Sequence, residues 1–155
     1  MQHPVSTIKA LSMLHSSLLV GQILFGVIAF YLVYSSNVTP VFINPEVVII
    51  IHSGAIGIAV AFIIASFTLY KKKVEKICSN AEPVQKKLAS YHTASLIRWA
   101  ILESSALLCI VCFILTGRYS LLLLSGIVLL YFIYIKPSTK KIMQELGISH
   151  EEVNE

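Results

Sequence analysis

Residues 47–70 read VVIIIHSGAIGIAVAFIIASFTLY, an unbroken apolar run without a charged side chain. A bilayer core about 30 Å thick is crossed by about 20 residues of α-helix, so this run is long enough to span a membrane. Strands of membrane barrels alternate apolar and polar residues, and the run lacks that alternation. It therefore predicts a transmembrane helix.

The rest of the chain has the same character. Of its 155 residues, 56% are hydrophobic and 13% are charged, which is far from the balance of a soluble domain. Further apolar segments at residues 10–34, 96–116 and 119–135 predict three more spans. We expect an all-α polytopic membrane protein with four transmembrane helices and a single domain over residues 1–155.

Breaks in the chain predict how these helices pair. Asn44-Pro45 is typical of a helix entry and separates the first two spans. Gly117 lies in a very short turn between the last two spans, so those helices should be antiparallel neighbours. The resulting arrangement is two antiparallel hairpins. The loop at residues 71–95 joins them, and its flanks on either side of Glu82-Pro83 could be helical extensions of the adjoining spans.

The basic residues predict the orientation. Six lysines lie in the loop at residues 71–95 and three in the tail at residues 136–155, whereas the other two connections contain only Arg118. Short loops rich in Lys and Arg stay on the cytoplasmic side, so both termini should be cytoplasmic. The Lys- and Ile-rich composition suggests a bacterial inner membrane. We interpret the lysines as topology signals that contact lipid headgroups, and expect no nucleic-acid partner.

The C-terminal tail contains one further element. Lys136-Pro137 should end the fourth span, and residues 138–146 have an amphipathic pattern that stops at Gly147. We expect a short interfacial helix there.

One carboxylate lies inside an apolar span. Glu103 occurs in the third span, where a charge costs at least a few kcal/mol unless it has a partner or a function. The first span contains a near copy of the surrounding sequence with His15 in its place, and helical spacing brings Ser12 and Gln22 close to the same side. These four residues are our candidates for a buried polar site that handles a proton or ion. Glu103 could pair with His15, or remain neutral and hydrogen-bond within the bundle.

A second pattern is found in the second span. Ser53, Gly57, Ala61 and Ala65 recur at every fourth position. Small residues at this spacing let another helix approach closely. The pattern predicts a tight helix–helix contact, either inside the chain or with a partner.

Motifs for catalysis, metals and cofactors are weak. His15, His52 and His92 are expected at different membrane depths, which disfavours a shared haem. Cys109 and Cys112 have the spacing of a redox pair, but inside an apolar helix we interpret them as small apolar side chains. Zinc-site spacings, phosphate-binding loops and nucleophile motifs are absent from the sequence. We therefore predict no catalytic residue, no metal and no cofactor, and lean against an enzyme.

The second half carries the one family resemblance. Arg98, Glu103, the turn at Gly117, and Pro137 followed by Ile142-Met143-x-x-Leu146 resemble small four-helix inner-membrane proteins of Bacteroidetes-like bacteria. The resemblance covers about fifty residues and implies no activity or binding residues.

The expected function is therefore structural. A chain with short loops and no catalytic motif is typical of a subunit or accessory protein of a membrane assembly, or of a homo-oligomer. Its partners would be membrane lipids and other membrane subunits or further copies of itself. The alternative is a small proton- or ion-coupled transporter or channel that uses Glu103 and His15, and a haem-binding membrane protein comes third.

Overall fold

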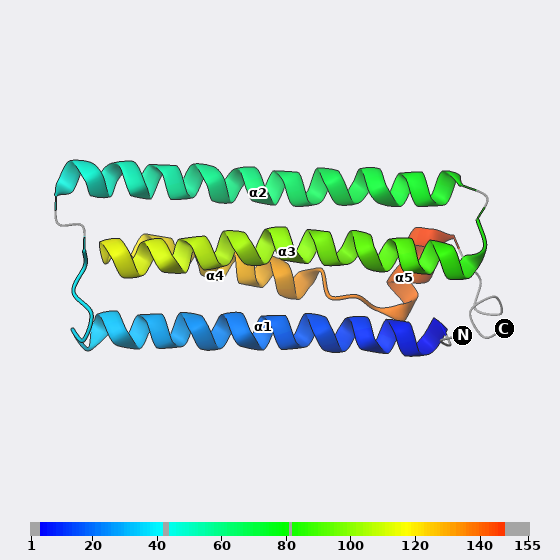
Figure 1. The fold of residues 1–155 in the computed structure, drawn as a ribbon, viewed down its shortest axis with the longest axis horizontal. Helices are drawn as coiled ribbons and strands as arrows, with labels where there is room; N and C mark the ends of the chain where they lie inside the picture. Colours follow the sequence, from blue (N-terminus) through cyan, green and yellow to red (C-terminus); the bar gives the residue numbers. More distant parts are fainter. Residues whose placement is uncertain (1–3, 42–43, 81, 148–155) are drawn as a thin grey trace.

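The computed structural model describes residues 4–41, 44–80 and 82–147. Within these ranges the chain is helical throughout, apart from short connections (Figure 1). The elements in order are α1 (Pro4–Tyr34), α2 (Pro45–Ser79), α3 (Val84–Thr116), α4 (Tyr119–Tyr134) and α5 (Thr139–Leu146). The prediction of an all-α protein is confirmed.

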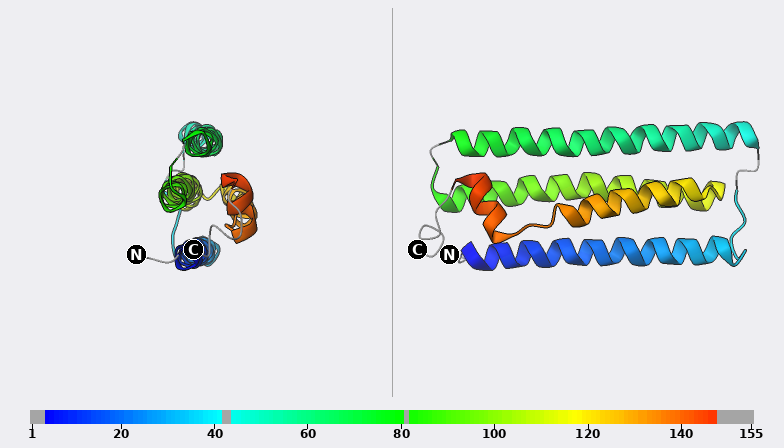
Figure 2. Two further views of the ribbon diagram at one scale, coloured as in Figure 1. Left: turned by 90° about the vertical axis from the view of Figure 1, so that its right-hand side faces the viewer. Right: turned by 180° about the vertical axis from the view of Figure 1, so that it is seen from behind.

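The helices form an elongated bundle with α3 at its centre. In the end view of Figure 2, α3 lies between α1 and α2, and α4 lies beside α1 and α3. α1 and α3 run in one direction, and α2 and α4 run in the other (Figure 1). The start of α1, the α2–α3 connection and α5 therefore meet at one end of the bundle, to which the lysines of residues 71–87 and 136–141 belong. We call this the basic end.

Three of the described helices are long and apolar enough to cross a membrane: Ala10–Tyr34 within α1, α2 and α3. In the most apolar window of α3 half of the residues are buried, compared with 11% in α1 and 17% in α2. The outer helices thus leave many Ile, Leu, Val and Phe side chains uncovered. Uncovered apolar surface on this scale is typical of a protein whose surroundings are lipid.

α4 occupies nearly the predicted range but is shorter than the other three. Its 16 residues rise about 24 Å, less than the roughly 30 Å of a bilayer core. Pro137 lacks an N–H group and cannot extend the helix, so residues 135–138 run on to α5 without helical structure. The described structure therefore contains three span-length helices and one shorter apolar helix.

The predicted breaks and extensions agree with the observed ends. Asn44 caps α2, because its Oδ1 atom accepts a hydrogen bond from the Glu46 N–H at 3.0 Å. Gly117 ends α3 in the left-handed conformation at φ 67°. α2 extends to Ser79 and α3 begins at Val84, so most of the predicted loop at residues 71–95 is helical. The lysines lie on helical extensions that project from the apolar part of the bundle.

α5 forms where an amphipathic helix was expected and ends at Gly147, φ 63°. Its apolar side chains Ile142, Met143 and Leu146 are buried in the same hydrophobic cluster as Trp99. The early end of α4 leaves room at the basic end, and α5 occupies it (Figure 1). The helix predicted to lie at the membrane interface thus has its apolar face against the protein.

Candidate functional site

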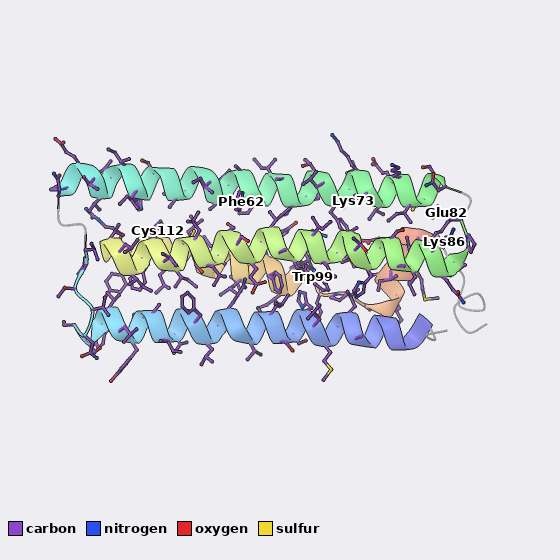
Figure 3. The ribbon with its side chains drawn as sticks, in the orientation of Figure 1. Phe62, Lys73, Glu82, Lys86, Trp99 and Cys112 are labelled. Atoms are coloured by element: carbon purple, nitrogen blue, oxygen red, sulfur yellow. The ribbon has the colours of Figure 1, made fainter. Side chains whose placement is uncertain are left out.

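His15 is the most specifically held of the predicted site residues. Its side chain is 1% exposed, and its ring is stacked on Phe132 of α4 at 4.3 Å between centroids. The Trp99 ring of α3 makes an edge-to-face contact with the His15 ring, with 4.8 Å between centroids, and Figure 3 shows Trp99 between α3 and α1. Its Nε2 atom lies 3.0 Å from the Phe132 carbonyl oxygen. A carbonyl only accepts, so Nε2 carries the proton and donates it.

This hydrogen bond provides a donor for a backbone carbonyl in the last turn of α4. In a continuing helix the Phe132 carbonyl would accept from the N–H of Lys136, but that N–H is bonded to the Ile133 carbonyl at 3.2 Å. His15 supplies the missing donor from a different helix. Because unpaired backbone groups are costly in a membrane, this contact lets α4 stop within the bundle.

Two helical turns farther from the basic end than His15 and Phe132, a second pair of polar residues lies on α1 and α4. Gln22 is seven residues after His15, and Ser125 is seven residues before Phe132. Because α1 and α4 are antiparallel, seven residues forward in α1 and seven residues back in α4 lead in the same direction along the bundle. Seven residues are close to two helical turns, so Gln22 lies on the same face of α1 as His15, and Ser125 lies on the same face of α4 as Phe132. Gln22 is 2% exposed and Ser125 is 1% exposed. The register thus places the Gln22 amide and the Ser125 hydroxyl on facing sides of α1 and α4.

Within the described residues, neither member of this pair has a hydrogen bond. The unpartnered buried atoms on α1 and α4 are both polar atoms of the Gln22 side chain, Ser125 Oγ and, nearer the end of α4, His15 Nδ1; on α3, Arg98 Nε and Ser105 Oγ also lack a partner among the described residues. Buried polar groups in proteins almost always have a partner, which is often an ordered water. We call His15, Gln22 and Ser125 the α1–α4 seam. Its three side chains can all be uncharged.

The other predicted members lie outside this seam. Glu103 is half-buried on α3, and in the described ranges no hydrogen bond or ion pair joins it to His15. Ser12 is half-buried, and its carbonyl accepts a hydrogen bond from Ser16 at 3.0 Å. Of the four predicted residues, His15 and Gln22 are therefore the two that are buried in the α1–α4 seam.

A different carboxylate is engaged at the basic end. Oε2 of Glu145 on α5 lies 2.5 Å from the Tyr70 hydroxyl and 2.8 Å from the Tyr91 hydroxyl. The two hydroxyls are themselves 2.8 Å apart. Each hydroxyl has one proton, so at any moment two of these three contacts are hydrogen bonds. This tyrosine–glutamate cluster fastens α5 to α2 and α3.

Arg98 extends the cluster to α4. Its Nη2 atom donates to the Tyr131 hydroxyl at 2.8 Å, and its guanidinium carbon lies 4.4 Å from the ring centroid of Tyr70. Such a cation–π contact is stronger when it is shielded from water, and Arg98 is 9% exposed. Sequence reasoning missed this cluster. Its one signal in the sequence is Glu145, which flanks the apolar face of an amphipathic helix.

The small-residue pattern of α2 is not used inside the chain. Ser53, Gly57 and Ala61 are exposed and Ala65 is half-buried. The buried residues of α2 are instead Val48, Ala55, Ala59 and Ser66. Of the two contacts left open by the sequence, the internal one is not formed by these residues.

The remaining candidates for cofactors stay apart. His52 Nε2 lies 2.8 Å from Ser120 Oγ at the end opposite the basic end, while His15 Nε2 is bound to a backbone carbonyl. Cys109 and Cys112 are free thiols. Among the described residues, no group of three or more His, Cys, Asp or Glu side chains is positioned to bind a metal ion.

Comparisons with protein-family models, with curated proteins and with solved structures each gave no significant match. The resemblance of the second half to small inner-membrane proteins therefore stays a prediction.

Proposed function

We propose that this protein is a non-catalytic integral membrane protein that acts as a subunit or accessory protein of a membrane assembly, or as a homo-oligomer. One observation carries the proposal. Ser53, Gly57 and Ala61 form a smooth outer face on α2, while α2 packs on α3 through other residues. A Cβ added at Gly57 would meet no heavy atom within 4 Å. A helix of another chain could approach closely at this face.

The proposed placement is four crossings of a bacterial inner membrane with both termini in the cytoplasm. α4 rises about 24 Å, and the four residues 135–138 can add about 13 Å when extended, so together they exceed a bilayer core. Two features support this route: the His15 hydrogen bond to the end of α4, and the lysines gathered at one end.

Cysteine labelling from outside the cell tests the placement. Single cysteines at Asn37, Lys86 and Gln144, in a chain whose own cysteines are replaced by alanine, report the two ends of the bundle. We expect labelling of Asn37→Cys alone. Labelling of Gln144→Cys together with Asn37→Cys would show that α4 does not cross.

Mass measurement of the intact protein in mild detergent tests the association. We expect a complex larger than one chain, and we expect Gly57→Leu to dissociate it. Gly21→Leu is the matched control, because Gly21 is also exposed in a helix with open space around its Cα. A monomeric wild-type particle, or equal effects of the two substitutions, would contradict the proposal.

A small proton- or ion-coupled transporter is the second candidate, and the α1–α4 seam is the observation in its favour. The Gln22 amide, Ser125 Oγ and His15 Nδ1 are buried and unpartnered among the described residues, as expected of a hydrated path. Proton flux into protein-containing vesicles tests it. Transport that is lost in Gln22→Leu would support this function over the structural one, and absence of flux would remove it.

A further inference from the structure

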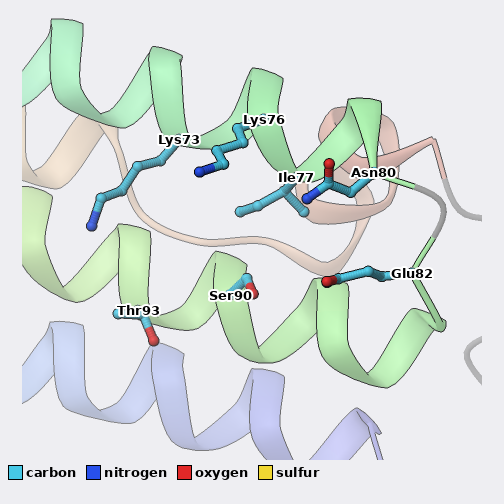
Figure 4. A pocket seen from close by; sticks show the side chains of 7 residues that line it. All are labelled: Lys73, Lys76, Ile77, Asn80, Glu82, Ser90 and Thr93. Atoms are coloured by element: carbon cyan, nitrogen blue, oxygen red, sulfur yellow. The ribbon is translucent and has the colours of Figure 1, made fainter.

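A hollow at the basic end opens between α2 and α3. Its volume is about 330 Å³, and Figure 4 shows the lining side chains Lys73, Lys76, Ile77, Asn80, Glu82, Ser90 and Thr93. The Lys73 and Lys76 side chains extend from α2 into the space before α3 (Figure 4). Within the described residues neither lysine forms an ion pair, whereas the neighbouring Lys71 lies 3.9 Å from Glu75. The hollow therefore presents two lysines without an ion pair among the described residues, beside hydroxyl groups and the Glu82 carboxylate.

A second hollow lies between the same two helices in their apolar part. It has a volume of about 350 Å³ and is lined by Phe62, Ala65, Ile97, Ala100, Ile101 and Ser104. Small side chains form part of its lining, and larger apolar side chains complete it. Its walls suit a hydrocarbon chain.

The two hollows lie in one groove. On α2, Phe62 and Ala65 precede Lys73 and Lys76 by eleven residues. On α3, Ile101 and Ser104 follow Ser90 and Thr93 by the same eleven residues. Eleven residues are close to three helical turns, so each set stays on one face of its helix. The second hollow is therefore about 16 Å deeper along the same groove.

We propose that this groove binds one glycerophospholipid. The phosphate contacts the ammonium groups of Lys73 and Lys76, and one acyl chain follows the groove into the hollow beside Ala65 and Ala100. Ammonium and hydroxyl groups are suitable donors to phosphate oxygens. Glu82 lies at the same hollow and can pair with a headgroup amine, so the favoured ligand is a phosphatidylethanolamine.

The positive charges of Lys73 and Lys76 favour a lipid over a helix of another protein as the occupant of the groove. An apolar helix along this groove would cover both lysines without providing an anion, at a high cost in desolvation. A phospholipid places its phosphate at the membrane surface and its hydrocarbon below, which matches the order of the two hollows. The inference depends on the membrane placement of α2 and α3 and is independent of association through Gly57.

Titration of the delipidated full-length protein in detergent with dioleoylphosphatidylethanolamine, followed by intact-mass measurement, tests the headgroup contacts. We expect Lys73→Gln with Lys76→Gln to weaken binding about tenfold, because each lysine near a lipid surface favours binding several-fold. Lys71→Gln with Lys72→Gln removes the same charge from the same run outside the hollow, and should leave binding nearly unchanged. Equal losses in both pairs would overturn the proposal, because they would indicate non-specific attraction.

The acyl-chain contacts need a separate pair of variants. Ala100→Leu with Ser104→Leu fills the deeper hollow and should abolish saturable binding of one lipid. Gly21→Leu adds bulk at an exposed site on α1, outside both hollows and away from the Gly57 face, and should retain it. Thermal melting checks that each variant is folded. Wild-type lipid binding by the folded, filled variant would overturn the proposal.

Competitors distinguish a lipid site from a phosphate site. Inorganic phosphate and glycerophosphoethanolamine carry the headgroup chemistry without the acyl chain, and should compete weakly. Displacement of the lipid by either at equal concentration would overturn the proposal in favour of a free-phosphate site. A co-purified protein released by the filled variant, with lipid binding unchanged, would identify a partner helix as the occupant. Neither result depends on whether Gly57→Leu changes the oligomeric state.

Discussion

The tyrosine–glutamate cluster and the α1–α4 seam both contain buried polar groups, but the first holds charged groups with partners and the second holds neutral groups that lack them among the described residues. At the basic end, the charged Glu145 and Arg98 are surrounded by tyrosine hydroxyls and rings. In the seam, Gln22 and Ser125 are uncharged and have no partner among the described residues. Charge in hydrocarbon is far more costly than a neutral polar group. The comparison indicates that the charged groups of this cluster are held by polar and aromatic partners, whereas the neutral Gln22 and Ser125 of the seam are buried without one in the described part of the chain.

Loss of the Glu145 carboxylate should have the largest effect. Glu145→Ala leaves the Tyr70 and Tyr91 hydroxyls without their acceptor and loosens α5. We expect a loss of about 2–4 kcal/mol in the free energy of unfolding, measured by thermal melting in detergent. Glu145→Gln retains an acceptor and should lose less. Gln144→Ala, at an exposed neighbour, is the control, and an equal loss there would show that the cluster is not responsible.

Truncation of His15 should have the second largest effect on the free energy of unfolding. His15→Ala removes the donor to the Phe132 carbonyl and opens a cavity beside Trp99, for an expected loss of about 2–3 kcal/mol. His15→Leu restores most of the volume but not the donor, so its remaining loss measures the hydrogen bond to the Phe132 carbonyl together with the ring contacts. Thermal melting of both variants, with exposed Met13→Ala as the control, gives the comparison. Full stability of His15→Leu would show that capping of α4 by His15 is unimportant.

Removal of both facing groups in the seam should cost little. Gln22→Leu together with Ser125→Ala replaces two buried groups that have no described partner, and such paired replacements are nearly neutral or stabilising. We expect a change within about 1 kcal/mol in the free energy of unfolding. A loss of more than about 2 kcal/mol would indicate that water or a ligand satisfies the pair in the membrane.

The smallest effect is expected at Glu103. Glu103→Gln should change the free energy of unfolding by less than about 0.5 kcal/mol, because the side chain is half-buried and no described hydrogen bond or ion pair holds it. In a double-mutant cycle its effect and that of His15→Ala should add. A coupling above about 1 kcal/mol would favour the predicted pairing of the two residues.

The sequence by itself determined the helices and their ends. Long apolar runs predicted four spans, of which three are helices of span length and the fourth, α4, is a shorter apolar helix. Asn44-Pro45 predicted the start of α2, and Gly117 and Gly147 predicted two helix ends. These features are local, because apolar length, a capping side chain and a left-handed glycine act within a few residues of the chain.

Only the tertiary structure decided which faces and polar groups meet. The sequence allowed Glu103 to pair with His15, but the partner of His15 is a backbone carbonyl left free where α4 ends. Backbone carbonyls are the same at every residue, so the sequence does not mark this one. Likewise, two sets of small residues occur on α2, and the rotation of the helix buries Ala55 and Ala59 instead of Gly57 and Ala61. Helical periodicity fixes which residues share a face, whereas the rotation and depth of each helix depend on contacts between segments far apart in the chain.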